Sequence, residues 1–261
     1  MSAPLRVSLV QADTVWENPA ANRRVLEGAT AGLAGGTDLV VLPEMFATGF
    51  SMQPARLAEP PGGDTAQWMS ALARMLDAAV TGSIITCEGG QHYNRLYWAT
   101  PDGALVHYDK RHLFRMGGED RHYAPGAAGL VVGWRGFRIA PLVCYDLRFP
   151  VWSRRRSGYD YDVLLYVASW PAPRRHAWRS LLTARAIENQ CYVVAVNRVG
   201  PDGNGASHAG DSVVHDFLGM PLVERGAEAA VATAALDRPA LDAFRDRFPA
   251  QLDADRFTLG A

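Results

Sequence analysis

Apolar runs of strand length, each leading into a polar turn, recur along this chain of 261 residues. Three of them, at residues 39–42, 163–168 and 192–196, are apolar or aromatic at every position. A strand with one face in water alternates apolar and polar residues, whereas a strand covered on both faces does not. Segments of helical period lie between the runs. The chain therefore predicts an α/β fold with buried strands, and this pattern alone fits a TIM barrel, a doubly wound sheet or a layered sandwich.

Start and stop signals place the expected helices. Asn18-Pro19 supplies a cap and a first-turn proline for a helix that Gly35-Gly36 ends, with inward residues at every fourth position: Val25, Ala29 and Leu33. Asp64 caps a second helix, whose apolar stripe predicts core packing: Trp68, Leu72, Met75, Leu76 and Ala79. A short helix is expected over 151–157 and a longer one over 177–190.

The remaining apolar runs predict further strands at 7–10, 83–87 and 137–143. Two hairpins are expected, one pairing 96–100 with 104–108 and one pairing 211–215 with 221–223. The glycine-rich stretch 200–210 has no strand-then-helix setting, so it predicts a surface turn between two strands rather than a phosphate loop.

The domain organisation follows from the order of these elements. The two halves of the chain show the same order of elements without a visible sequence repeat, and no linker separates them. We therefore expect one domain over 1–261, with a core at about 5–237 and a tail at 238–261. Phe244, Phe248 and Phe257 lie among charges in that tail, which is expected to pack back on its own domain or to cross to a second subunit.

Composition and charge exclude several classes of protein. With 26 basic and 27 acidic residues the formal net charge is −1, which does not indicate binding to nucleic acid or to a membrane surface. The one basic run, Arg154-Arg155-Arg156, is expected to be a solvated face at the start of a helix. No apolar stretch approaches the ~18 residues of a membrane span, and no signal peptide is visible at 1–10. The cytoplasm is the expected compartment.

Cys144 occupies an unusual position among the apolar runs. It ends the run 137–143 and is followed at once by the polar turn 145–150, whereas an inert structural cysteine more usually lies within such a run. Glu44 and Lys110 end two other runs in the same way. Ligands bind at the carboxyl ends of strands in α/β sheets. A thiol, a carboxylate and an amine presented there predict a catalytic site.

The other cysteines and the histidines indicate no second chemistry. Cys87 and Cys191 lie within or at the start of apolar strands and are expected in the core. Three cysteines without close spacing predict neither a disulfide framework nor a zinc cluster, and the seven histidines show no metal-ligand spacing. A papain-like Cys–His pair stays open from spacing alone, although no histidine ends a buried apolar run.

Three segments together resemble the signatures of the nitrilase superfamily of carbon–nitrogen hydrolases: Leu42-Pro43-Glu44, residues 109–114 and residues 142–150. The order Glu, Lys, Cys matches, and 183–189 resembles the helix that follows the nucleophile in that family. The similarity runs from Val7 to about Asp237 and is greatest to the bacterial ω-amidase branch. It implies a four-layer α-β-β-α sandwich and a homodimer formed by pairing helices.

The resemblance also implies a mechanism. Cys144 attacks the amide carbon, Glu44 accepts the thiol proton and later donates it, and Lys110 holds the oxyanion together with the backbone N–H of Tyr145. No metal or organic cofactor is required. Glu119 alone would be a solvated loop carboxylate, but the family match makes it a second glutamate that orients the lysine.

The substrate expected from the resemblance is a small amide. Cys144-Tyr145-Asp146 departs from the Cys-Trp-Glu of true nitrilases, which favours an ω-amidase acting on 2-oxoglutaramate or 2-oxosuccinamate. Another amidase, an N-carbamoyl amino acid hydrolase and a nitrilase remain alternatives within the superfamily.

The parts of the site that would bind the substrate are less determined. The carboxylate of such a substrate needs a cation, which the sequence does not choose from three arginines: Arg115, Arg174 and Arg175. Phe46 and Trp170 are candidate pocket walls, with core packing equally open for each. Arg148 is a candidate substrate contact, although an ion pair with Asp146 is the expected role.

Two readings from other classes stay open. Cys144 could be the reversibly oxidised thiol of a redox sensor, or the chain could be a catalytically silent binding scaffold. No second cysteine stands ready to resolve an oxidised thiol, and a scaffold has no need of Glu44, Lys110 and Cys144 together.

Overall fold

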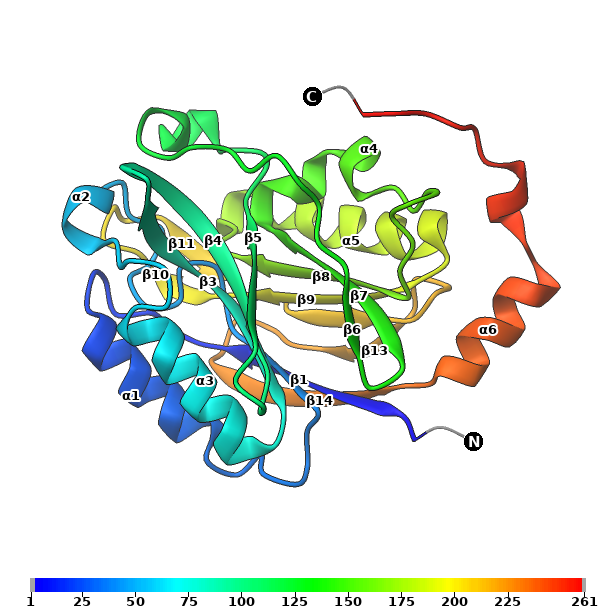
Figure 1. Cartoon of the computed structure of the whole chain (residues 1–261), viewed down its shortest axis with the longest axis horizontal. Coiled ribbons are helices and arrows are strands. Elements are labelled where there is room, and N and C mark those ends of the chain that lie inside the picture. The colour runs from blue at the N-terminus through cyan, green and yellow to red at the C-terminus, as the bar shows by residue number, and fades with distance from the viewer. Residues whose placement is uncertain (1–2, 260–261) are drawn as a thin grey trace.

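Two six-stranded β-sheets pack face to face in the computed structural model, which describes residues 3–259 (Figure 1). The first sheet has the order β14-β1-β2-β3-β4-β5, with bounds β1 (Leu5–Gln11), β2 (Leu39–Val41), β3 (Ala79–Glu88), β4 (Gln91–Ala99), β5 (Leu105–Asp109) and β14 (Ala230–Leu236). The second has the order β13-β12-β9-β8-β7-β6, with bounds β6 (Val132–Trp134), β7 (Phe137–Val143), β8 (Val163–Ala168), β9 (Tyr192–Asn197), β12 (Val213–His215) and β13 (Pro221–Glu224).

Helices cover the outer face of each sheet (Figure 1). The first sheet carries α1 (Pro19–Thr30) and α3 (Asp64–Leu76), and the second carries α4 (Pro150–Ser153) and α5 (Arg175–Asn189). The result is the predicted four-layer α-β-β-α sandwich. Outside the layers lie α2 (Pro54–Leu57) and α6 (Arg238–Arg247), and five 3-10 turns complete the described part: η1 (Arg115–Gly117), η2 (Glu119–Arg121), η3 (Cys144–Arg148), η4 (Ala172–Arg174) and η5 (Ala250–Asp253). Among these residues no helix combines the length and apolar character that a membrane crossing requires.

The central strands β2, β8 and β9 are apolar at nearly every position because strands in the middle of each sheet contribute to two cores. From β1 and β2, Val7 and Val41 point into the layer between the sheets and pack with residues of β7, β8 and β9. Their neighbours Val10 and Val40 point the other way and pack with residues of α1 and α3. A strand with two covered faces has no position left for a solvated side chain, which explains the continuous runs.

The first helix departs from its predicted inward face and length. It ends at Thr30 rather than near Gly35, and Val25 is 47% exposed. The buried face includes Asn22, whose side chain bonds the backbone of Val15 and Ala47. The helix therefore buries a polar residue that bonds to neighbouring loops, and it exposes Val25, which was predicted to face the core.

The second helix differs from the prediction at its cap residue and at its carboxyl end. Gly63, not Asp64, is its cap residue, Met75 is exposed, and Ala79 already belongs to β3. Asp77 takes a left-handed conformation with φ 48° and its N–H bonds the carbonyls of the last turn. Such a turn at a residue other than glycine has no strong sequence signal.

The predicted helix over 151–157 is also wrong beyond Ser153. The arginines that follow α4 are half-buried rather than a solvated helix face. Arg154 donates to the carbonyl of Glu188 at 3.0 Å and Arg155 to that of Asn189 at 3.2 Å. Cations at the carboxyl end of α5 are favoured by the helix dipole and satisfy carbonyls that lack helical partners.

The hairpins agree with the predictions, and the structure adds strands that were not predicted. Both predicted hairpins form, and the glycine-rich stretch becomes the pair β10 (Val199–Pro201) and β11 (Ser207–Ala209). The sequence analysis missed β14, which pairs antiparallel with β1, and β6, which pairs antiparallel with β7. In the tail α6 buries Leu241, and Arg156 lies over the ring of Phe257 at 5.8 Å, so the described tail packs on its own chain.

One backbone arrangement occurs twice. Arg6 N–H donates to Asp38 Oδ2 at 2.8 Å, and Asp38 N–H returns a bond to the Arg6 carbonyl at 2.8 Å. Arg138 and Asp162 make the same two bonds, both at 2.8 Å, and in each pair the guanidinium also reaches the carboxylate. Each pair ties the start of a strand to the residue before its parallel neighbour. The halves therefore share a structural repeat that the sequence did not reveal.

Candidate active site

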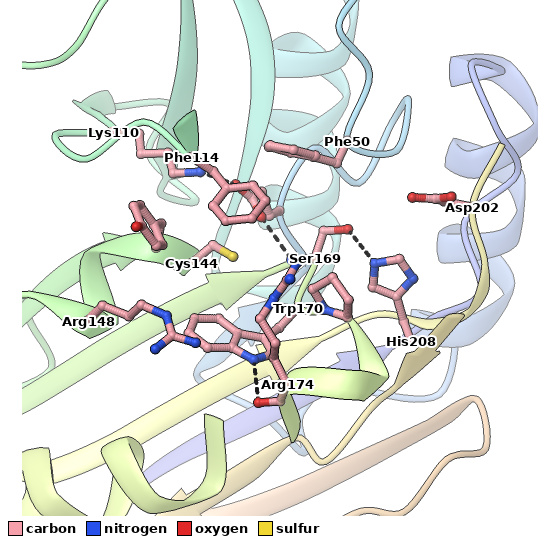
Figure 2. Close-up of a pocket in the computed structure, with 13 residues that line it drawn as sticks. Phe50, Lys110, Phe114, Cys144, Arg148, Ser169, Trp170, Arg174, Asp202 and His208 are labelled. Atoms are coloured by element: carbon pink, nitrogen blue, oxygen red, sulfur yellow. Dashed lines mark hydrogen bonds and ion pairs between the residues drawn. The ribbon is translucent and has the colours of Figure 1, made fainter. Parts of the chain in front are cut away.

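The three residues expected at strand ends meet in one cavity (Figure 2). Glu44 follows β2, Lys110 follows β5 and Cys144 follows β7. Because β4 reverses direction between β3 and β5, the carboxyl end of β5 returns to the edge where β2 ends. The second sheet brings the end of β7 to the same place.

Lys110 is fully buried between two carboxylates. Its Nζ donates to Glu44 Oε1 at 2.8 Å and to Glu119 Oε2 and Oε1 at 2.8 and 3.0 Å. Burial by itself lowers the pKa of Lys110, but the charges of Glu119 and Glu44 outweigh it and hold that pKa well above its usual value. The lysine is therefore a permanent cation at the centre of the site.

Glu44 is held by three donors from different elements. Its Oε1 accepts from Lys110 and from Asn94 Nδ2 at 2.8 Å, and its Oε2 accepts from the N–H of Ser169 at 2.8 Å. Asn94 was not predicted as a site residue, because it lies inside β4, away from any strand end. These bonds leave Oε2 as the oxygen with the freer lone pair.

Glu119 lies on η2 and is fully buried. It accepts from Lys110, from the N–H of Phe114 at 2.6 Å and from Asn94 at 3.1 Å. Burial and the charge of Glu44 raise the pKa of Glu119, while Lys110 opposes that rise. One ammonium group thus serves two carboxyl groups.

Cys144 begins the turn η3 in a left-handed conformation, with φ 44°. An L-residue adopts this conformation at a cost in energy, and such positions cluster at functional sites. Burial and the charge of Glu44 raise the pKa of the Cys144 thiol well above its usual value, against opposing effects of Lys110 and the Ser169 N–H. The resting sulfur is therefore a neutral thiol that needs a base.

The predicted ion pair between Asp146 and Arg148 is wrong. Asp146 is buried and accepts from the hydroxyl of Tyr108 at 2.8 Å and from the backbone of Val143 at 3.0 Å. Its other oxygen meets the N–H and the Nδ1 of His112, at 3.0 and 2.8 Å. A carboxylate with these partners has no need of an arginine, and it joins the cysteine turn to the segment on both sides of the lysine.

The cavity measures about 50 Å³ and is walled largely by aromatic side chains. Of the predicted substrate contacts, Trp170 and Arg148 line it, but Phe46 does not. Phe46 packs under α3 against Trp68, with ring centroids 5.8 Å apart, and Phe50 lines the cavity instead. The remaining residues around the cavity are Glu44, Lys110, Phe114, Cys144, Tyr145, Ser169, Pro171, Arg174, Asp202 and His208.

The other thiols and the histidines lie apart from the sulfur of this cavity. Cys191 is buried in the core and Cys87 is half-buried at the end of β3. His208 lines the cavity, but its Nε2 faces the hydroxyl of Ser169 at 3.1 Å. Within residues 3–259, no three His, Cys, Asp or Glu side chains are grouped as metal ligands.

Two sheets between helices, with a buried thiol, an ammonium and two carboxyl groups at one edge, are the arrangement of the nitrilase superfamily of carbon–nitrogen hydrolases. A family model described as carbon-nitrogen hydrolase matches residues 6–246. The chain belongs to this carbon–nitrogen hydrolase family and is an enzyme that hydrolyses carbon–nitrogen bonds.

Relatives of known name are similar to this chain along nearly their whole length. Omega-amidase YafV of Escherichia coli (strain K12) is 47% identical over 258 residues, covering 98% of each chain. The 2-oxoglutaramate amidase of Bacillus subtilis (strain 168) is 33% identical, covering 93% of this chain and 95% of its own. A solved CN-hydrolase superfamily protein of Xanthomonas campestris, with an arsenic adduct in its active site, is 51% identical with a TM-score of 0.97, covering 98% of this chain and 99% of its own.

Proposed function

We propose that this protein is an ω-amidase that hydrolyses the terminal amide of 2-oxoglutaramate or 2-oxosuccinamate through a thioester on Cys144. The observation that carries the mechanism is the convergence of the Cys144 thiol, the Glu44 carboxylate and the buried Lys110 ammonium on one cavity. The similarity to an omega-amidase and to a 2-oxoglutaramate amidase supports the choice of substrate.

The first step is attack of sulfur on the amide carbon. Glu44 Oε2 accepts the thiol proton as the S–C bond forms, since its Oε1 already accepts from Lys110 and Asn94. Negative charge then develops on the amide oxygen. Lys110 and the backbone N–H of Tyr145 hold that oxyanion, and loss of one such donor typically slows a reaction by about 10²–10³-fold.

The second step expels ammonia and the third releases the acid. Protonated Glu44 gives its proton to the departing nitrogen as the C–N bond breaks, which leaves a thioester. Water then attacks the thioester carbonyl, and Glu44 takes a proton from that water and returns it to the leaving sulfur. Throughout this cycle Glu119 stays against Lys110, so the ammonium keeps an anionic partner while Glu44 is protonated.

Asn94 supports both glutamates in this scheme. Its Nδ2 donates to Glu44 Oε1 and to Glu119 Oε1, at 2.8 and 3.1 Å. We assign it a positioning role, because it holds the Oε1 atoms in place and directs Glu44 Oε2 toward the thiol.

The cavity suits a short substrate with a flat chain. Trp170 and Phe50 form part of its wall, and Arg148 adds a positive charge. A redox sensor is disfavoured by the same geometry, since oxidation selects exposed thiolates and Cys144 is a thiol only 8% exposed.

A comparison of kcat/KM values tests the assignment. We expect 2-oxoglutaramate or 2-oxosuccinamate to exceed glutamine or asparagine, an N-carbamoyl amino acid and an aliphatic nitrile of similar size, by up to about 10³-fold. A higher value for the carbamoyl compound or the nitrile would overturn the ω-amidase assignment and leave the cysteine mechanism standing.

We further propose one domain over 1–261 that forms a homodimer. Exposed apolar side chains gather on the outer face of α5 and the β12–β13 hairpin, where Gly219 lies against Ile187: Ile187, Leu218, Met220 and Leu222. A second copy packed on this face would cover them. Sedimentation analysis of the protein and of an Ile187→Glu variant tests this, and a monomeric wild type would refute it.

We place the enzyme in the cytoplasm, because a reducing compartment keeps the free thiol of Cys144 active.

A further inference from the structure

Three arginines could have supplied the cation for a substrate carboxylate, and the structure distinguishes them. Arg115 pairs with Asp120 at 2.8 Å, and Arg175 pairs with Asp211 through two bonds at 3.0 and 2.8 Å. Arg174 lines the cavity and has no carboxylate partner within residues 3–259. Its charge alone among the three is available to a ligand.

Aromatic rings, rather than acids, hold Arg174 in place. Its guanidinium carbon lies 5.1 Å from the ring centre of Phe114, and Nη1 lies 3.9 Å from the sulfur of Met116. Its backbone carbonyl accepts from Trp170 Nε1 at 2.9 Å. A cation over a ring face is stabilised without being neutralised, so these contacts fix the group and preserve its charge.

The wall beneath Arg174 is connected to the reacting groups. The ring centres of Phe114 and Tyr145 lie 5.1 Å apart, and the backbone N–H of Phe114 donates a hydrogen bond to Glu119. Tyr145 directly follows Cys144. The ring that supports the Arg174 guanidinium therefore packs against the residue next to the reacting sulfur.

A second unpaired guanidinium lies on the neighbouring wall. Arg148 has no carboxylate partner in the described chain, and its guanidinium carbon lies 5.0 Å from the ring centre of Trp170. In Figure 2, Arg148, Trp170 and Arg174 lie below Cys144 in the view, and Lys110 and Phe50 lie above it. In this view the two guanidinium groups lie on the opposite side of the sulfur from the ammonium of Lys110.

Asp202, the one acid besides Glu44 that lines the cavity in the part of the chain the structure describes, does not pair with these cations. Asp202 Oδ1 accepts from the N–H groups of Asn204 and Ala206, both at 2.9 Å, within its own turn. It forms no ion pair with Arg148 or Arg174 among the described residues. An anion entering the cavity would therefore meet two guanidinium groups that have no other anionic partner within residues 3–259.

We propose that Arg174 is the anchor for the substrate carboxylate and that Arg148 assists it. This inference rests on the proposed function, which supplies a carboxylate at one end of the substrate and an amide at the other. A guanidinium matches a carboxylate with two parallel N–H donors, and a lysine cannot reproduce that geometry. Arg174 thereby selects substrates whose far end is anionic.

The test uses a pair of substrates that differ only at the far end. 4-Oxopentanamide has the chain and ketone of 2-oxoglutaramate, with a methyl group in place of the carboxylate. For Arg174→Met we expect kcat/KM for 2-oxoglutaramate to fall about 10–100-fold, mainly through KM, and kcat/KM for 4-oxopentanamide to stay within about twofold. Arg174→Lys should recover part of the loss.

Arg115→Met is the matched control, since it removes the same charge from a side chain 85% exposed. It should leave both substrates unchanged. Equal losses on the two substrates in Arg174→Met, or no loss on 2-oxoglutaramate, would overturn the inference. If the wild type prefers an N-carbamoyl amino acid, the proposed function fails, and the same comparison on that acid and its methyl-ended analogue still decides the role of Arg174.

Discussion

The two sheets are alike at the amino ends of their parallel strands and differ at the carboxyl ends. At the amino ends, Arg6 with Asp38 and Arg138 with Asp162 make the same main-chain and side-chain bonds. At the carboxyl ends the first sheet supplies Glu44 and Lys110, and the second supplies Cys144 and the Ser169 N–H. Neither sheet alone holds both the Cys144 thiol and the Glu44 carboxylate.

This difference separates stability from chemistry. The two Arg–Asp pairs, here called the clamps, lie at the ends of the strands opposite the cavity. A change in a clamp should alter the free energy of unfolding more than the rate of hydrolysis. Changes at the other edge should do the reverse. The following predictions test that separation, from the largest expected effect to the smallest.

Replacing the thiol should have the largest effect. Cys144→Ala should lose ammonia release by at least about 10³-fold, because no other group can form the thioester. Its melting temperature should change little, since a small side chain in a lined cavity is removed. Ammonia assays and thermal melts check this, with Cys87→Ala as the control expected to keep its activity. Sustained turnover by Cys144→Ala would refute the mechanism.

Replacing the base should have the next effect. Glu44→Gln keeps the shape but removes the proton acceptor, so acylation should slow by about 10²–10⁴-fold, even with an activated ester. Stopped-flow measurement of the acylation burst separates this step from thioester hydrolysis. A burst at the wild-type rate would mean that another group deprotonates Cys144.

At the opposite edge, Asp162→Asn should destabilise the protein without harming catalysis. The buried carboxylate accepts from Arg138, Arg238 and Arg245, and its loss leaves these arginines without a common anion. We expect a cost of ~3 kcal/mol in the free energy of unfolding and a kcat/KM within about twofold of wild type. Denaturant titration measures the first quantity. A large fall in kcat/KM would show that the two edges are coupled.

Asp38→Asn should cost less than Asp162→Asn, although the clamp is the same. Its partners Arg6 and Arg135 have side chains 38% and 41% exposed, so water can solvate them once the carboxylate is gone. Solvent screening reduces the expected cost to ~1 kcal/mol. Equal costs for the two variants would contradict this ranking.

The smallest expected effect is the pH dependence of the two clamps. Burial alone would raise the pKa of Asp162, but bonds and charge from Arg138 and Arg238 outweigh it, and Arg6 likewise lowers the pKa of Asp38. A lowered pKa gives stability that is complete above the unfolded value of ~3.9 and is lost as pH falls through the folded value. The stability gap between wild type and Asp162→Asn should therefore narrow below about pH 4. Thermal melts from pH 3 to 6 check this, and a constant gap would refute it.

Signals that lie within a strand and its turn could be read from the sequence. The continuous apolar runs predicted the buried strands, and their polar ends predicted that Glu44, Lys110 and Cys144 would meet. Glu119 came only from the family resemblance. Each of these signals is local, because a strand that ends at a sheet edge must present its next residue there.

Features that depend on distant segments could not be read. Asn94 matters because Glu44 and Glu119 converge on it from other elements, and nothing beside it in β4 indicates this. The choice of Phe50 over Phe46 depends on the turn after Glu44, where Met45 adopts φ 43°. The Arg–Asp repeat involves pairs whose members lie 32 and 24 residues apart, so no local pattern carries it.

The sharing of one ammonium by two carboxyl groups has a consequence for turnover. With both carboxyl groups ionised, the deep end of the cavity carries one surplus negative charge. An amide enters this end uncharged, but hydrolysis converts it into a second carboxylate beside Glu44 and Glu119. Like charges at such distances repel strongly in a medium of low dielectric constant. Repulsion from Glu44 and Glu119 should therefore favour release of the product, and the dicarboxylate should be a poor inhibitor of the reaction.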